Sequence, residues 1–150
     1  MNKRLRSIGN IGLAVGCAVF AAAPALALGG GSGTFSDPLR NSDSSAQLTG
    51  GRWYFDTWAP GPTYPGFHYS GALKDIKADG DWVYTRGKVD GYGWGGGASA
   101  ENHAEAGTTK DVAQKVWGAD PPGRGKIQVC RHRAGALPNI CVESQWKYPR

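Results

Sequence analysis

Apolar and polar residues alternate in short runs from Leu48 to the C-terminus. Aromatic and β-branched residues fill these runs, glycine, proline, asparagine and aspartate separate them, and no run shows a convincing helical spacing. Alternation with a period of two places successive side chains on opposite faces of a strand. The pattern therefore predicts an all-β fold, a single antiparallel β-sandwich of about seven short strands over residues 48–150.

Turn residues divide this region into the expected strands. Residues 78–81 contain an Asp-Gly pair typical of a tight turn, so the strand after it is expected to return antiparallel to the strand before it. Two of the segments, 98–107 and 111–117, also fit a helix, and that alternative stays open. The expected strands cover residues 52–58, 67–77, 82–90, 98–107, 111–117, 126–132 and 139–146.

The last two expected strands each carry one cysteine. Alternation places Ile127 and Val129 on one face and Cys130 on the other, and it separates Val142 from Cys141 in the same way. Both cysteines therefore belong to the polar outer face, where they are expected to form a disulfide. The bridge would close a loop of about a dozen residues and stabilise the fold by roughly 3 kcal/mol. The enclosed loop, residues 131–139, is basic and expected to be exposed.

The N-terminus has the organisation of a secretory signal. Residues 1–6 carry three cations, residues 8–23 carry no charge, and Ala25-Leu26-Ala27 provides a small-residue cleavage site. A retained membrane anchor is the alternative, but the cleavage site and the glycine and alanine content favour removal. We expect a signal peptide over residues 1–27, a secreted product without membrane contact after cleavage, and a flexible Gly/Ser-rich lead-in over residues 28–47.

Loss of the signal changes the charge balance. Lys3, Arg4 and Arg6 leave with it, so the formal net charge falls from +5 to +2. The basic character of the full chain therefore gives no reason to expect a nucleic-acid partner. The remaining positive charge gathers in the C-terminal part, where it can steer an anionic partner, although on most proteins a mixed charged surface is only solvated.

Several short motifs resemble one group of proteins. Residues 67–71 (Phe-His-Tyr-Ser-Gly), 77–81 (Lys-Ala-Asp-Gly-Asp), 88–94 (Lys-Val-Asp-Gly-Tyr-Gly-Trp), and the Val-Cys-Arg and Leu-Pro-Asn-Ile-Cys segments at 129–131 and 137–141 are similar to small secreted proteins of high-GC Gram-positive bacteria. The resemblance spans residues 67–141. It implies export and an all-β domain, and it assigns no functional residue.

The main candidates for catalytic chemistry form one group, although His68 and His132 could also serve as a base. Glu101, His103 and Glu105 alternate along an expected strand, about 7 Å apart on one face. They are candidates for a small secreted hydrolase or a divalent ion, although the solvated face of an edge strand explains them as well. The chain has no Gly-x-Ser-x-Gly motif, and its two cysteines after signal removal are expected in the disulfide. A non-catalytic role without cofactor or metal is therefore favoured.

Four aspartates are also candidate calcium ligands, but their spacing does not match an EF-hand loop and turn chemistry accounts for the Asp-Gly pair. They are Asp75, Asp79, Asp81 and Asp90.

Aromatic residues are more numerous than one core face per sheet requires. Exposed rings would form a platform that stacks on sugars or contacts a protein, such as a cell-wall glycan or another extracellular protein. The alternative, that most rings pack in the core, stays open. Arg131 and Arg133 add a clamped basic loop, which would also suit a secreted inhibitor or toxin. The candidate binding residues are Trp58, Trp82, Tyr92, Trp94, Arg131 and Arg133.

Overall fold

The computed structural model describes residues 30–56, 65–95, 99–104, 106–117 and 122–149. Within these ranges the protein is all-β, with nine strands in two antiparallel sheets and no helix. The all-β antiparallel prediction is confirmed. The expected signal peptide at 1–27 lies outside the described residues. The strands are β1 (Ser32–Thr34), β2 (Leu39–Arg40), β3 (Ala46–Phe55), β4 (Gly66–Asp75), β5 (Val83–Val89), β6 (Ser99–Asn102), β7 (Thr109–Trp117), β8 (Gly125–Arg131) and β9 (Ile140–Glu143).

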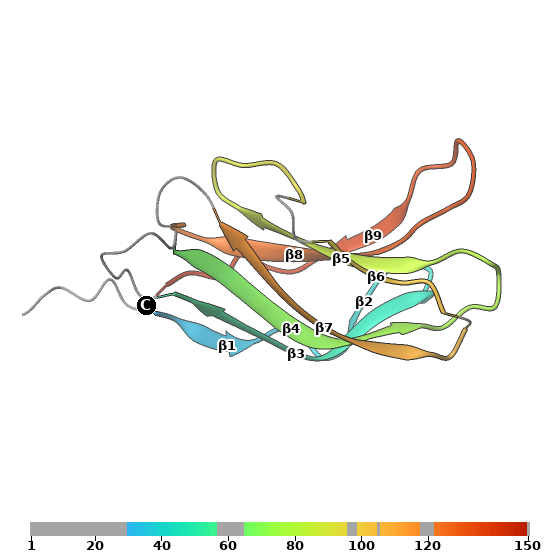
Figure 1. Ribbon diagram of the computed structural model, residues 1–150, viewed down its shortest axis with the longest axis horizontal. Helices are drawn as coiled ribbons and strands as arrows, with labels where there is room; N and C mark the ends of the chain where they lie inside the picture. Colours follow the sequence, from blue (N-terminus) through green and yellow to red (C-terminus); the bar gives the residue numbers. More distant parts are fainter. Residues whose placement is uncertain (1–29, 57–64, 96–98, 105, 118–121, 150) are drawn as a thin grey trace, which may run out of the picture.

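The strands divide into two layers (Figure 1). Sheet A has the order β1-β3-β4-β7, with β2 also paired to β3. Sheet B has the order β6-β5-β8-β9 and lies above sheet A in Figure 1. One buried apolar cluster contains residues of both sheets, so their inner faces share a core.

The segment expected to be a flexible lead-in is part of sheet A from residue 32 onward. β1 pairs with the C-terminal half of β3, and β2 pairs with its N-terminal half. Phe35, Leu39 and Ala46 are buried in the core. This part of the prediction is corrected: these apolar side chains, although too widely spaced to show a period, anchor a glycine- and serine-rich segment against the edge of the sheet.

The predicted pairing of residues 82–90 with residues 67–77 is also corrected. β4 pairs with β3 and β7, whereas β5 pairs with β6 and β8. Residues 76–82 therefore cross from one sheet to the other. The Asp-Gly turn lies within this longer connection, where the Asp79 and Asp81 carboxylates bind Arg131 instead of closing a two-residue hairpin.

The segments that also fitted a helix are strands where they are described. In β6, Ala100 and Asn102 are buried, and in β7, Val112 and Val116 are buried, so both strands turn alternate residues to the core. The last expected hairpin is confirmed, since β8 and β9 pair antiparallel with Cys130 opposite Cys141.

Two inner glycines of sheet B let the layers approach closely. A Cβ atom at Gly87 would lie 2.3 Å from Val116 Cγ2, and one at Gly125 would lie 2.3 Å from the Phe67 ring. Beside Gly87, the Tyr69 and Thr85 hydroxyls form a 3.3 Å hydrogen bond across the core. Burial raises the pKa of Tyr69 to about 12, and the bond to Thr85 opposes that rise only in part. This packing fixes the two outer faces on opposite sides of the molecule.

Candidate functional site

The outer face of sheet B carries a regular set of polar and aromatic side chains. On β5, Tyr84, Arg86 and Lys88 alternate with inward residues, as the sequence pattern of this strand predicts. The pairing of β5 with β8 places Lys88 directly opposite Lys126. The same register sets Arg86 opposite Gln128 and Tyr84 opposite Cys130.

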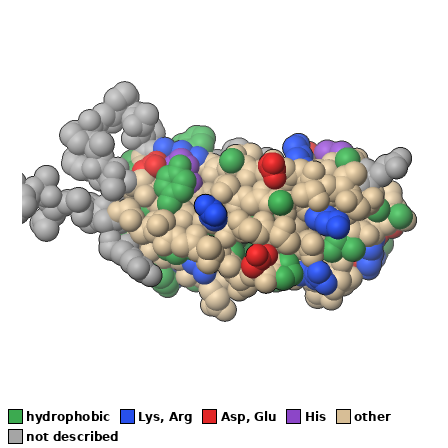
Figure 2. All heavy atoms as spheres, turned by 90° about the horizontal axis from the view of Figure 1, so that it is seen from below, with side chains coloured by type: hydrophobic (Ala, Val, Ile, Leu, Met, Phe, Trp, Pro, Cys, Tyr) green, Lys and Arg blue, Asp and Glu red, His purple; other side chains and the backbone are tan. Residues whose placement is uncertain are grey.

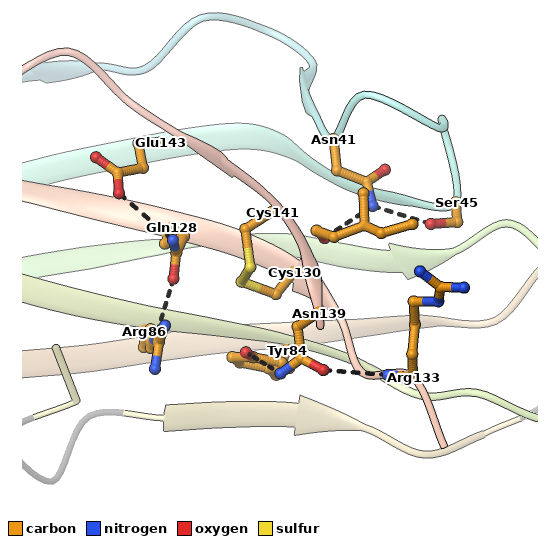
Figure 3. The surroundings of a disulfide bond; sticks show 11 residues. Asn41, Ser45, Tyr84, Arg86, Gln128, Cys130, Arg133, Asn139, Cys141 and Glu143 are labelled. Carbon is orange, nitrogen blue, oxygen red and sulfur yellow. Dashed lines mark hydrogen bonds between the residues drawn. A yellow bond between two sulfur atoms is a disulfide. The ribbon is translucent and has the colours of Figure 1, made fainter. Parts of the chain in front are cut away.

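The disulfide between Cys130 and Cys141 joins β8 to β9 on this face, with the two Cα atoms 4.1 Å apart (Figure 3). This confirms the predicted pairing, and it is consistent with an extracellular protein. Cys130 is fully buried although it is on the outer face. Beside it, Asn139 donates a 2.9 Å hydrogen bond to the Tyr84 hydroxyl and accepts one from the Arg133 backbone N–H.

A row of polar contacts crosses sheet B next to the disulfide (Figure 3). The Arg86 Nε donates a 2.7 Å hydrogen bond to Gln128 Oε1. The Gln128 amide then donates to Glu143, 3.4 Å away, and Glu143 also forms an ion pair with Lys126. The row holds the Arg86 guanidinium in place through a neutral partner, so its charge is not neutralised.

Two indoles lie among the cations at the end of this face near Lys88. Trp94 has the Arg86 Cζ 5.5 Å, the Lys88 Nζ 5.8 Å and the Lys126 Nζ 5.1 Å from its ring. Trp146 has the Lys126 Nζ 4.8 Å and the Arg124 Cζ 4.5 Å from its ring. Both indoles are half-buried. We call this group the indole–cation patch; it consists of Arg86, Lys88, Trp94, Arg124, Lys126 and Trp146.

Trp82 lies at the opposite end of the same face. Its ring stacks on His103 and on His132, with both centroid distances 4.5 Å. Because β5 lies between β6 and β8, the two imidazoles flank the indole. The Trp82 ring is therefore occupied by stacking on two imidazoles of the protein itself.

The hydrolase candidates near Trp82 form one pair. His103 Nε2 lies 2.7 Å from Glu101 Oε2, with 59% and 44% of the two side chains exposed. Glu105 lies outside the described residues. Glu101 is the hydrogen-bond partner of the His103 ring. The two side chains line a shallow hollow, and the described residues that share it carry no hydroxyl or thiol to act as a nucleophile.

Arg131 points inward and does not belong to an exposed basic loop. Its guanidinium pairs with Asp43 at 2.9 Å, Asp79 at 2.6 Å and Asp81 at 2.8 Å, and 16% of the side chain is exposed. The prediction of Arg131 as a surface binding residue is corrected, because residue 131 shares the inward face of β8 with Ile127 and Val129.

The carboxylates near Arg131 differ in how far hydrogen bonds and cations offset the cost of burying their charge. Burial opposes ionisation of Asp43, but hydrogen bonds from Ser45, Arg131 and Lys77 hold its pKa far below the usual range. Burial raises the pKa of Asp75, which is 2% exposed, and the backbone N–H of Lys77 only partly offsets this. Two of the candidate calcium ligands, Asp79 and Asp81, thus bind the Arg131 guanidinium, and Asp75 is buried without an ion pair among the described residues. The fourth, Asp90, accepts hydrogen bonds from the backbone of Gly123 and Arg124.

The remainder of loop 131–139 is exposed from Ala134 to Asn139, with Leu137 54% exposed. Arg133 is half-buried at its base. The loop is fixed by the disulfide, by Asn139 and by a hydrogen bond from the Ala134 N–H to Asp81.

Sheet A presents a different outer face. Asp56 pairs with Lys115 at 2.7 Å and lies 2.8 Å from His68 Nε2, while Tyr54 stacks on the His68 ring. Burial opposes ionisation of Asp56, but Lys115 and His68 hold its pKa below the usual range. Figure 2 views the molecule from the side on which β1 and β3 lie in Figure 1, and it shows acidic and basic side chains scattered over this surface.

The structure separates the predicted binding residues. Trp58 lies outside the described residues, Trp82 is stacked between histidines, and Tyr92 is 44% exposed in the turn after β5. Trp94 lies in the indole–cation patch. The remaining patch members were missed, although the alternation of Arg86 and Lys88 with buried residues on β5 was a signal in the sequence.

A scan against protein-family models found no match to the chain, and searches of curated proteins and of solved structures also found none. No helix within the described ranges is long and apolar enough to cross a membrane. In the same ranges, no three His, Cys, Asp or Glu side chains are grouped to hold a metal ion.

Proposed function

We propose that this protein is a secreted, non-catalytic β-sandwich module that binds an extracellular glycan, such as a cell-wall polysaccharide, through the outer face of sheet B. The export signal expected at residues 1–27 and the disulfide support the location. The indole–cation patch supports the activity, because indoles stack on the apolar faces of sugars while neighbouring cations contact polar substituents.

One observation carries the proposal: Lys88 faces Lys126 directly across two strands. Like charges in that position lower the stability of a sheet. Glu143 pairs with Lys126, and the described residues provide no ion pair for Arg86, Lys88 or Arg124. A concentration of indoles and of cations without ion-pair partners is the property expected of a binding surface.

The other two interpretations have less support. His103 and Glu101 lie on an exposed surface without a described nucleophile, so a hydrolase lacks part of its machinery. An inhibitor built on residues 131–139 loses its main cation, because Arg131 is held by three carboxylates.

Truncation of the patch indoles tests this function. Purified protein expressed from the full sequence is incubated with insoluble cell walls and polysaccharide matrices, and the bound fraction is measured. Trp94→Ala and Trp146→Ala should each weaken retention at least about tenfold, as expected for an indole anchor worth about 1.4 kcal/mol or more.

Trp117→Ala is the matched control, because Trp117 is 48% exposed at the end of β7 in sheet A. This variant should bind like the wild type. Absence of retention on every matrix, or equal loss in all three variants, would contradict the proposed function.

A further inference from the structure

We infer that the indole–cation patch selects an anionic polysaccharide, a sugar polymer bearing carboxylate or phosphate groups. This inference rests on the glycan-binding function proposed above and names the class of glycan. It is motivated by the order of the side chains and by the charge they leave unbalanced.

Cations and indoles alternate across the patch. Arg86 and Lys88 lie against Trp94, Lys126 lies within 5.1 Å of both indole rings, and Arg124 lies against Trp146. A sugar ring stacked on an indole carries its acidic substituent at the edge of the ring. That edge would fall beside a cation at either indole, so an acidic sugar stacked on either ring would meet a positive charge.

The charge balance favours an anion. None of the six patch residues is acidic, and Glu143, the carboxylate bound to Lys126, is shared with Gln128. An anionic group placed between Lys88 and Lys126 would convert their mutual repulsion into attraction to a common partner. A neutral glycan would leave that repulsion in place.

The cations are also ordered before a ligand arrives. Gln128 fixes the Arg86 guanidinium, and the indoles restrict the Lys88 and Lys126 side chains. Ordered long side chains lose less conformational entropy when they bind, which increases the affinity available from each ion pair.

Two matched pairs of polymers provide the test. Polygalacturonate is compared with its fully methyl-esterified form, and phosphomannan with unphosphorylated mannan, by titration calorimetry of the full chain. Affinity should be at least about tenfold greater for the anionic member of one or both pairs. It should fall about tenfold between 0.1 and 1 M salt, as the screening length shortens from about 10 Å to about 3 Å.

Two charge variants of equal net charge locate the effect. Lys88→Gln/Arg124→Gln should weaken binding of the anionic polymer about tenfold. The circular dichroism spectrum of this variant should match that of the wild-type protein, because the described residues give neither side chain a hydrogen bond. Arg52→Gln/Lys74→Gln removes two cations from the outer face of sheet A, and it should bind like the wild type.

Binding of the carboxylated or the phosphorylated polymer supports the inference and identifies the acid. Equal binding of charged and neutral polymers without salt dependence would overturn it, while the proposed glycan-binding function would stand. Equal losses in both charge variants would overturn the assignment to the patch. Competition by single-stranded DNA at equal affinity, with the same response to the variants, would overturn the choice of a polysaccharide.

Discussion

The two outer faces of this protein are built on similar pleated sheets, yet they treat charge differently. On sheet A, Asp56 lies between Lys115 and His68, and Tyr54 covers the imidazole. On sheet B, Lys88 and Lys126 face each other, and indoles rather than carboxylates lie beside most of the cations. The core between the sheets is shared, so the difference originates on the surfaces alone.

This contrast teaches that positive charge has two uses in the chain. Cations with carboxylate partners stabilise the fold, and cations without them remain available to a ligand. If that distinction is correct, substitution of a paired cation should lower stability, whereas substitution of an unpaired cation should leave stability unchanged or raise it slightly.

The most highly paired cation gives the largest expected effect. Arg131→Gln removes the partner of three carboxylates, and we expect the free energy of unfolding to fall by about 3 kcal/mol, because Asp79 and Asp81 lose their ion pair and Asp43 keeps only Lys77. Urea denaturation measures the change. Arg133→Gln removes an equal charge nearby and should change stability by less than about 0.5 kcal/mol; a similar loss in both variants would contradict the distinction.

The paired face should respond to pH. Asp56 has a lowered pKa in the folded protein, so its contribution to stability is present above the unfolded value near 3.9 and is lost as the pH falls through the folded value. Asp56→Asn should therefore lower stability by about 1 kcal/mol at pH 7 and by progressively less below pH 4.

Denaturation curves between pH 2 and pH 7 measure this convergence. Asp111→Asn is the control, since Asp111 is exposed on the same sheet and has no ion pair among the described residues. Its curve should follow the wild type, and a pH-independent difference for Asp56→Asn would argue against a charge effect.

The smallest expected change has the opposite sign. Lys88→Glu places a carboxylate opposite Lys126, so we expect a gain in stability of about 0.5 kcal/mol together with loss of glycan binding. Thermal denaturation and the retention assay measure the two effects. Lys74→Glu on sheet A should produce neither, and a stability loss in Lys88→Glu would show that the lysine pair serves the fold.

Local pattern in the sequence was sufficient for part of this structure. The alternation in residues 126–146 predicted the last hairpin and the Cys130–Cys141 bridge, because the two strands lie close in sequence and a short loop joins them. The alternation along this strand also placed Tyr84 on the face of the sheet away from Val83 and Thr85. In each case the information resides in neighbouring residues.

Other features depended on pairing between distant segments. Lys88 faces Lys126 only because β5 pairs with β8, whereas the Asp-Gly turn had suggested that β5 returns along β4. Residues 32–40 belong to sheet A because β4 occupies one edge of β3 and leaves the other edge to β1 and β2. No local period in the sequence reveals that pairing. Arg131 was different. Alternation already placed it on the same face as Ile127 and Val129, which indicated an inward side chain, but the basic composition of the loop led to the prediction of an exposed one.

The position of Arg131 along the chain has a consequence for biogenesis. All three carboxylates that it binds belong to segments that precede it, and Asp43 lies 88 residues earlier. During synthesis from the N-terminus, this end of the molecule carries an excess of negative charge until most of the polypeptide has been made. A product cut short before residue 131 would lack both the guanidinium and the Cys130–Cys141 disulfide, and would be an early target for proteolysis.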